Sequence, residues 1–507
     1  MQLHRVVAVA MAVGLVGTAC GARVSRDERS AAANAILSSS GSGTTGGTQA
    51  TDGTTDTSSL GQQPGSDGNA SGPTTNGTTG NSQPTTSGQT STTTHGNQST
   101  TTTKPGKNGQ QTTTAGASCP TSGKDVGLTS NSIVLGGVAD ISGPVSGLFA
   151  GAKQGLAAFQ AYANSQGGIC GHQVQIQFGD SGTNCSQNQN VTEGLVNKVF
   201  AFVGNFSLYD GTGCGGKVIK DNPTVPDISV AIDPSLSTLK NHYDFAPGVP
   251  GYGTGMFAYY AKKFGTKVQR AGTITENIPS VLAKQKVFVH TAESQGWKFV
   301  YQNAASPTSS NFTSNFQQAC GRDHIQVFFT ETVNAQYAAT MLANERSVAA
   351  CKGVINVMGI AYDSALLGFY QGNPDDLIVY GWTPNALFFN ADEAKNIPEV
   401  ALFQQWFRRT NPGQPLNLYA MYVWSAGRLM QQAIENAGPT LTRKTALASL
   451  DRVKNFDENG LLIPSTPSSK TTGGHCYLLF ELRHSTFSRV DDPATGFRCD
   501  GRFLPLN

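Results

Sequence analysis

Residues 132–180 constrain the fold more than any other part of the chain. Residues 133–138 form a short apolar run, as expected for a buried parallel strand. The turn Ser142-Gly143-Pro144 interrupts this run, and the residues after it carry apolar side chains at helical spacing. Gly167-Gly168 is typical of a helix C-cap, and a second strand is expected after it. The segment therefore predicts a βαβ unit with a binding turn at the carboxyl end of its first strand.

The rest of the chain repeats this alternation of strand and helix, and a second series of strands begins near Arg270. Two parallel sheets, each covered by helices, fit such a pattern. We therefore predict an α/β fold with two Rossmann-like lobes. The expected strands after the first are residues 173–178, 201–203, 226–230, 270–274, 299–301, 326–329, 354–358 and 378–380, with helices over 191–199 and after Gly215.

Three local patterns in the βαβ unit resemble the periplasmic leucine/isoleucine/valine-binding protein family. They are the turn at residues 141–145, the small residues that begin the helix near Gly155, and the run Asn164-Ser165-Gln166-Gly167-Gly168-Ile169-Cys170-Gly171. Members of that family are two-lobed solute receptors that serve ABC importers. The resemblance extends over roughly residues 127–461 and implies a type I periplasmic binding fold, in which a multi-strand hinge joins the lobes.

The resemblance also implies a domain organisation in which the chain crosses between lobes several times. We expect crossings near Phe245, Asn385 and Asp457. Lobe 1 then comprises residues 127–245 plus about 385–456, and lobe 2 comprises 246–384 plus about 457–507. Beyond Leu461 the resemblance is poor, and we expect a β-rich addition closed by a disulfide.

The first 118 residues predict export and attachment rather than folding. Residues 1–20 have a short basic start, an apolar stretch and small residues before Cys20, as in a lipoprotein signal peptide. The residue three positions before the cysteine is Gly17 rather than the usual Leu, so plain secretion is the alternative. We expect lipidation of Cys20 and an anchor in the cell membrane, with the body facing the periplasm or the cell exterior. Residues 21–118 are rich in Ser, Thr and Gly and predict a disordered tether.

Charge and cysteine content narrow the class of protein further. The 13% charged fraction and the net charge of +2 give no signature of nucleic-acid binding. Apart from Cys20, eight of the nine cysteines remain, an even number that favours disulfides in an exported protein. In the resembled family a bridge joins the regions of Cys185 and Cys214, and we expect that pair here. The other expected pairs are Cys320–Cys351, Cys476–Cys499 and Cys119–Cys170. A metal site is the alternative for these cysteines, but the sequence has no C-x-x-C motif and no paired histidines to support it.

Two glycine-rich segments look like nucleotide sites but depart from them. Residues 211–217 are one residue short of a phosphate-binding P-loop, and Val218 stands where a Ser or Thr must hold magnesium. Residues 248–255 lack the preceding strand of a dinucleotide site. We interpret the first segment as a helix start close to the ligand and the second as a hinge or helix entry. No catalytic motif is visible either, so neither a cofactor nor an enzymatic activity is expected.

The resemblance implies ligand-binding residues in two loops of lobe 1. A hydroxyl-rich loop after the third strand holds the ligand carboxylate in the family, and Ser207 and Tyr209 occupy that place here. The next loop offers Ser229 and Ala231, while Asp233 stands near the family's threonine. A carboxylate at that position would repel an amino acid's carboxylate but could pair with an ammonium group. This departure argues against an ordinary aliphatic amino acid.

Further candidates come from aromatic positions and from lobe 2, with core packing as the alternative for each aromatic. They are Phe149, Tyr419, Asn277, Ser280, Tyr362 and Trp382. The expected function is that of a solute-binding protein that closes over a small polar organic ligand, such as an amino acid or amide, and delivers it to ABC permease subunits. The alternatives are a ligand sensor or envelope-assembly protein of the same fold, and an envelope enzyme.

Overall fold

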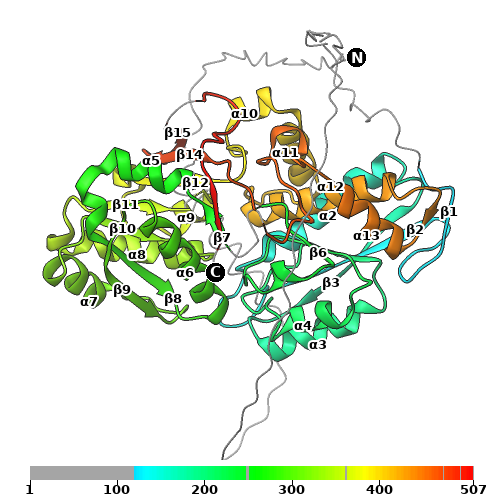
Figure 1. The fold of residues 1–507 in the computed structure, drawn as a ribbon, viewed down its shortest axis with the longest axis horizontal. Coiled ribbons are helices and arrows are strands. Elements are labelled where there is room, and N and C mark those ends of the chain that lie inside the picture. Colours follow the sequence, from blue (N-terminus) through cyan, green and yellow to red (C-terminus); the bar gives the residue numbers. More distant parts are fainter. Residues whose placement is uncertain (1–118, 247–250, 360–361, 472, 491–492, 506–507) are drawn as a thin grey trace, which may run out of the picture. The chain divides into compact units, whose positions relative to one another are not determined.

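The computed structural model describes residues 119–246, 251–359, 362–471, 473–490 and 493–505. The expected signal peptide, the lipidated Cys20 and the tether over residues 21–118 lie outside the described residues. Two α/β sheets organise the body (Figure 1).

The first sheet contains five parallel strands in the order β3-β2-β4-β5-β6. Strand β2 pairs with β3 over eight residues, and the apolar run predicted for β2 is almost entirely buried. The predicted βαβ unit is therefore present, with helix α2 between the two strands. The elements of this sheet are β2 (Ser132–Ala139), α2 (Ala150–Ser165), β3 (Gln173–Asp180), α3 (Cys185–Val196), β4 (Ala201–Val203), α4 (Gly215–Asp221), β5 (Asp227–Ile228), η1 (Leu236–Thr238) and β6 (His242–Tyr243).

Helix α3 differs from the expectation of a helix over residues 191–199, because it begins at Cys185 and ends at Val196. Its start is fixed by Asn184, whose side chain accepts a hydrogen bond from the Gln187 backbone N–H at 2.9 Å. Asparagine at such a position satisfies a backbone donor that the first helical turn leaves open. The N-cap therefore sets a boundary that the apolar spacing did not indicate.

A late segment of the chain packs on the first sheet's helix α2. Helices α11 (Pro398–Thr410) and α12 (Leu418–Glu435) both contact α2. The α2–α12 contact depends on glycines: a Cβ at Gly155 would lie 2.2 Å from the Ala420 carbonyl oxygen, and one at Gly427 would lie 2.4 Å from the Phe159 ring. The two helices can approach this closely only without those side chains. Helices α10 (Ala391–Asn396) and α13 (Arg443–Arg452) flank this pair in the sequence.

The second sheet has seven strands in the order β15-β14-β12-β11-β10-β8-β9. Strands β8 to β12 are parallel, as predicted, whereas β14 pairs antiparallel with β12 and β15 pairs antiparallel with β14. This sheet is therefore mixed rather than purely parallel. Its elements are α5 (Gly255–Phe264), η2 (Gly265–Arg270), β8 (Ala271–Glu276), α6 (Pro279–Glu293), β9 (Phe299–Ala305), α7 (Thr313–Phe316), η3 (Gln317–Arg322), β10 (Val327–Thr330), α8 (Ala335–Ser347), η4 (Ala349–Cys351), β11 (Ile355–Met358), α9 (Ser364–Phe369), η5 (Pro374–Asp376), β12 (Val379–Thr383), β14 (Leu478–Arg483) and β15 (Thr486–Arg489). The short helix η6 (Glu458–Gly460) contacts α11 and α12 instead.

Two small strand pairs tie distant parts of the chain together. Strand β1 (Ser122–Gly123) is parallel to β13 (Thr440–Leu441). Strand β16 (Phe503–Pro505) is antiparallel to β7 (Gly251–Gly253), which lies just before α5. Part of the glycine cluster at 248–255 is thus a strand and a helix start, while residues 247–250 lie outside the described residues. The chain crossings expected near Phe245, Asn385 and Asp457, and the lobe boundaries that follow from them, remain predictions.

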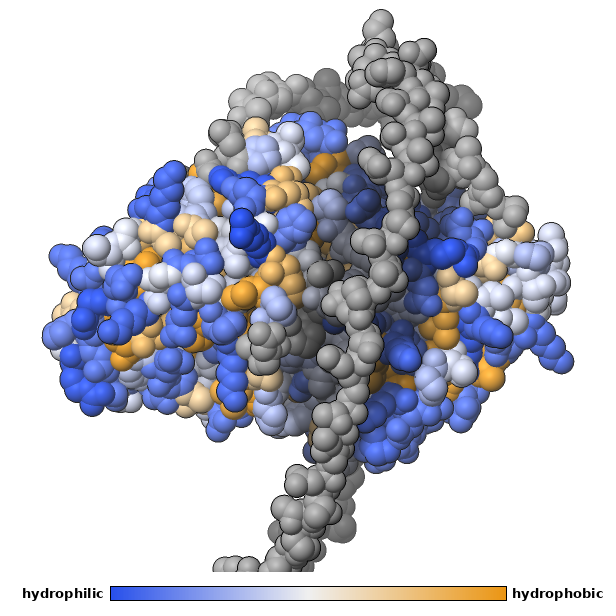
Figure 2. All heavy atoms as spheres, viewed as in Figure 1, coloured by the Kyte–Doolittle hydropathy of each residue, from blue (hydrophilic) through white to orange (hydrophobic). Residues whose placement is uncertain are grey.

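The four expected disulfides are present: Cys119–Cys170, Cys185–Cys214, Cys320–Cys351 and Cys476–Cys499. Within the described ranges no helix is long and apolar enough to cross a membrane, and no group of three or more His, Cys, Asp or Glu side chains is placed to hold a metal ion. On the face drawn in Figure 2 the coloured surface is mainly hydrophilic, with hydrophobic residues in small separate groups.

Candidate functional site

A cavity lies between the strand ends of the two sheets. It encloses about 850 Å³ of empty space, part of it open to solvent, a size typical of small-molecule sites. Loops that follow parallel strands meet at such an edge, where open α/β sheets bind ligands. From the first sheet's loops the lining residues are Phe206, Val230, Ala231, Ile232 and Ala246.

The opposite wall comes from the second sheet and from helix α6, whereas helix α12, which packs on α2, closes the cavity from the side of the first sheet. Helix α6 contributes Lys284, and the residue directly after β10 is Glu331. The other lining residues are Tyr252, Val281, Phe288, Thr332, Val333, Gly359, Tyr362, Trp382, Thr383, Pro384, Leu418, Tyr419 and Tyr422. The cavity is therefore mainly apolar and aromatic, with one acidic and one basic side chain.

Glu331 has an unusual environment for a carboxylate. Its Oε2 atom is buried and has no hydrogen-bond partner among the described residues, although the residue as a whole is partly exposed. Burial raises the pKa of Glu331 to about 8, against the opposing effects of the Lys284 charge and the Gly359 N–H. Glycine at 359 leaves room for this carboxyl group, since a Cβ there would lie 2.0 Å from Oε2. At neutral pH the side chain is thus mostly a neutral acid that can donate a hydrogen bond.

Three buried carboxylates of the first sheet position the loops at its strand ends. Asp140 follows β2 and accepts hydrogen bonds from the Ser207 hydroxyl at 2.9 Å and the Leu208 N–H at 2.8 Å. Asp210 accepts the N–H groups of residues 232 and 233 at 2.7 and 2.8 Å. Burial raises the pKa of both carboxyls, most strongly that of Asp210.

The third carboxylate, Asp244, belongs to a buried cluster around His242. Asp244 accepts the Ala231 N–H at 3.1 Å and the Ala246 N–H at 3.2 Å. His242 Nδ1 lies 2.6 Å from Asp227 Oδ2. Burial acts to lower the pKa of His242, but hydrogen bonds to Asp227 and Asp244 outweigh it and raise the pKa to about 9. The charged imidazolium thus balances Asp227 and Asp244, and Asp244 in turn holds two cavity-lining loops in place.

Four of the residues predicted from the sequence line this cavity. They are Ala231, Tyr362, Trp382 and Tyr419. Phe149 lies behind the wall, with its ring centroid 4.6 Å from that of Tyr419. The sequence placed these aromatics near the site, and the structure gives Phe149 a packing role against the lining.

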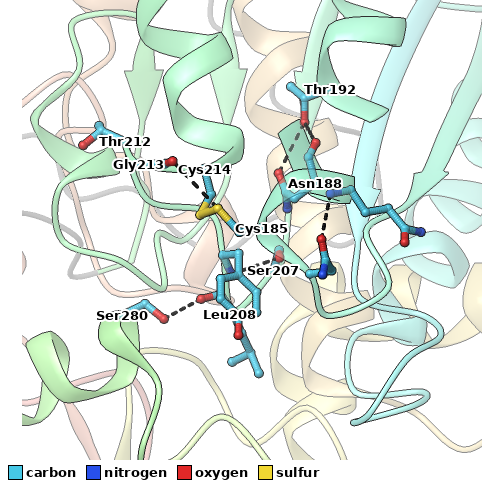
Figure 3. Close-up of a disulfide and its surroundings, with 12 residues drawn as sticks. Cys185, Asn188, Thr192, Ser207, Leu208, Thr212, Gly213, Cys214 and Ser280 are labelled. Atoms are coloured by element: carbon cyan, nitrogen blue, oxygen red, sulfur yellow. Dashed lines mark hydrogen bonds between the residues drawn. A yellow bond between two sulfur atoms is a disulfide. The ribbon is translucent and has the colours of Figure 1, made fainter. Parts of the chain in front are cut away.

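The other predicted residues do not line the cavity. Ser207 bonds to Asp140, and the Ser280 hydroxyl donates to the Leu208 carbonyl at 2.6 Å, near the Cys185–Cys214 disulfide (Figure 3). Asp233 accepts the Ser235 N–H at 2.8 Å and lies against Gly211. The remaining three are Ser229, whose buried hydroxyl has no partner among the described residues, half-buried Tyr209, and exposed Asn277.

The glycine-rich segment 211–217 has a packing explanation. Cys214 caps helix α4, and a Cβ at Gly215 would lie only 1.6 Å from Asn188 Oδ1 of α3. Gly215 and Gly216 are not among the lining residues of the large cavity. Glycine here lets α4 begin against α3 rather than next to that cavity.

Sequence reasoning missed Lys284 and Glu331, the two charged residues of the cavity. A signal for Glu331 was available, because it lies two residues after the end of the strand predicted over residues 326–329. Lys284 lies one helical turn after Ser280 on α6. A helix predicted over this segment would therefore have placed Lys284 on the same face as the candidate Ser280.

Comparisons with known proteins place the chain among solute receptors of similar fold. Residues 132–486 match a family model described as periplasmic binding protein. A search of curated proteins finds no match. At 15% identity, a fatty acid ABC transporter substrate-binding protein from Thermomonospora curvata has a TM-score of 0.59, with 75% of this chain and 95% of that chain covered.

Two other solved structures show the same fold. The leucine-binding protein LivK from Thermotoga maritima is 14% identical, with a TM-score of 0.58 and coverage of 71% of this chain and 98% of that chain. A solute-binding protein from R. palustris, in complex with 4-hydroxybenzoate, is 16% identical, with a TM-score of 0.54 and coverage of 74% and 97%.

Proposed function

The chain belongs to the periplasmic binding protein family, and we propose that it is the extracytoplasmic solute-binding component of an ABC importer, anchored to the membrane through Cys20. The observation that carries the proposal is the cavity of about 850 Å³ lined from both sheets. A ligand enclosed there contacts both walls at once, so binding stabilises the arrangement that a permease can recognise.

The sequence suggested a small polar ligand, whereas the lining of the cavity supports one with a substantial apolar part. Most of the lining side chains are aliphatic or aromatic, and the walls include Phe206, Trp382 and Tyr419. Apolar ligand surface transferred into such a site gains about 25 cal/mol per Å². Of the residues predicted from the sequence, we propose that Ala231, Tyr362, Trp382 and Tyr419 contact the ligand directly.

The test is to identify the ligand and then to block its site. Protein purified without denaturation is extracted, and the released compound is identified by mass spectrometry. Ala231→Trp places an indole at the cavity wall, whereas Ala401→Trp makes the same change on the exposed side of α11. Both variants should melt cooperatively, but only Ala231→Trp should lose the bound compound.

The importer role is tested separately from binding. Cells that lack the protein should take up the identified compound more slowly, and the Ala401→Trp protein should restore uptake while Ala231→Trp should not. Retention of the compound by Ala231→Trp would contradict the site. Normal uptake in cells without the protein would contradict the importer role and favour the sensor or assembly alternative.

A further inference from the structure

The backbone donors of the first sheet's loops are already used inside the protein. The N–H of Leu208 donates to Asp140, those of Ile232 and Asp233 donate to Asp210, and those of Ala231 and Ala246 donate to Asp244. The Ser207 hydroxyl also donates to Asp140. Three protein carboxylates thus occupy these five N–H groups and this hydroxyl, which are then not available to a bound carboxylate.

The face that these loops turn to the cavity is correspondingly apolar. Its side chains are Phe206, Val230, Ala231, Ile232 and Ala246. A polar ligand group pressed against this face would lose its hydrogen bonds to water without replacement, at a cost of about 1 to 3 kcal/mol. The apolar part of the ligand therefore belongs on this side.

In the rest of the lining, most hydroxyl groups are also engaged with protein acceptors. Thr332 donates to Glu276 at 2.5 Å, Thr383 donates to Asn385 at 2.6 Å, and Tyr419 donates to the Val333 carbonyl at 2.7 Å. Glu331 differs, because its buried Oε2 has no hydrogen-bond partner among the described residues. Lys284 lines the same cavity, and its charge acts to lower the pKa of the Glu331 carboxyl.

We propose, on the basis of the solute-binding function above, that the ligand is a monocarboxylic acid with an apolar body, whose carboxylate binds at the wall that carries the Glu331 carboxyl group and Lys284. The apolar body then lies against the loops of the first sheet. The arrangement assigns opposite ends of one amphipathic molecule to the two walls.

Charge balance favours an acid over an amine. The charged or titratable groups that face Glu331 are Lys284 of α6, Tyr252 of β7, and Tyr419 and Tyr422 of α12. Burial raises the pKa of all three phenols, so they are neutral. With Glu331 also protonated, the positive charge of Lys284 attracts a ligand carboxylate. An ammonium ligand would instead add a second positive charge in a site of low dielectric constant.

The experiment compares three probes with the same hydrocarbon body: 3-phenylpropanoate, 3-phenylpropanamide and 3-phenylpropylamine. Titration calorimetry at pH 7 should find that the acid binds at least tenfold more tightly than the amide and the amine. At pH 8, close to the pKa of Glu331, about half of the carboxyls are ionised, so binding of the acid should take up about half a proton. Measurements in buffers with different ionisation enthalpies give this number directly.

Variants of the two charged residues separate their roles. Lys284→Met should weaken binding of the acid at least tenfold, and Lys284→Arg should restore most of it. Glu331→Gln should abolish the proton uptake. A matched control is Glu345→Gln, a buried acid outside the cavity with its pKa raised to about 7 by burial, which should leave the uptake unchanged.

Three results would overturn the ligand class: tighter binding of the amine or amide, release of protons when the acid binds, or no binding of the acid at millimolar concentration. If one of these occurs while Ala231→Trp still loses its co-purifying compound, the solute-binding function stands and the acid assignment fails. If Ala231→Trp keeps that compound as well, both proposals fail.

Discussion

Replacing Glu331 by glutamine should change how the stability of the ligand-free protein depends on pH. The pKa of Glu331 is about 8 in the folded protein, against an ordinary value of 4.5. Between these pH values the unfolded chain releases a proton that the folded protein keeps, so the free energy of unfolding falls as the pH rises. Glutamine resembles the protonated acid and does not titrate, so this dependence should disappear in the variant.

The size of the effect follows from the two pKa values. For a single group with these values, the loss between pH 5 and pH 7 is about 2.5 kcal/mol. Because Glu331 is partly exposed through the cavity, solvent should reduce this to between about 1 and 2.5 kcal/mol. For a body of this size, the larger value corresponds to roughly 3 °C in melting temperature.

The assay is denaturant unfolding of wild type and Glu331→Gln at pH 5, 6 and 7. Other buried acids also make the free energy of unfolding fall as the pH rises, and they do so equally in both proteins. Burial raises the pKa of Glu276 to about 7 and that of Asp363 to about 6. The difference between the two proteins therefore isolates residue 331. Glu193→Gln makes the same change on the exposed side of α3 and should follow the wild type. Parallel curves for wild type and Glu331→Gln would refute the assignment of a buried, protonated carboxyl.

Three further predictions concern covalent and ionic contacts. Replacing Cys185 and Cys214 by alanine removes a bridge between residues 29 apart and should lower the free energy of unfolding by about 3.5 kcal/mol, measured with urea. Arg428→Ala leaves the buried Glu399 carboxylate without the partner that now lies 2.9 Å away, so it should cost about 3 to 5 kcal/mol in the same assay. Cys20→Ala should move the protein from the membrane fraction to the soluble fraction on cell fractionation, and unchanged membrane association would contradict lipidation.

The alternation of strands and helices could be predicted because each strand of a parallel sheet is a short apolar run bounded by turn residues. Strands β4 and β10 match their predicted ranges closely. The antiparallel addition of β14 to β12 could not be assigned in advance, since it depends on pairing between residues about 100 positions apart. The contact of α12 with α2 also joins residues far apart in sequence. The need for glycine at the contact can be recognised only once it is known that the two helices pack together.

The candidate site was predicted unevenly for a related reason. Trp382 and Tyr362 lie at or just after strands, and that position alone suggested them. The hydroxyl of Ser207 was expected to face a ligand, yet it bonds to Asp140 from a different strand end. Whether a polar side chain meets a ligand or another side chain depends on loops that are far apart in sequence, so local patterns cannot decide it.

The bridge between Cys119 and Cys170 has a mechanical consequence. Tension that reaches the body along the chain from its N-terminal side enters at Cys119 and passes through the sulfur bond to Cys170. The residues between these cysteines, which include β2 and α2, are bypassed and carry no load. When the body is stretched until it unfolds, this closed loop of 51 residues should withhold roughly 180 Å of extension, and reducing the bond should release it. A pull from the N-terminal side therefore spares strand β2, which lies between β3 and β4 in the first sheet.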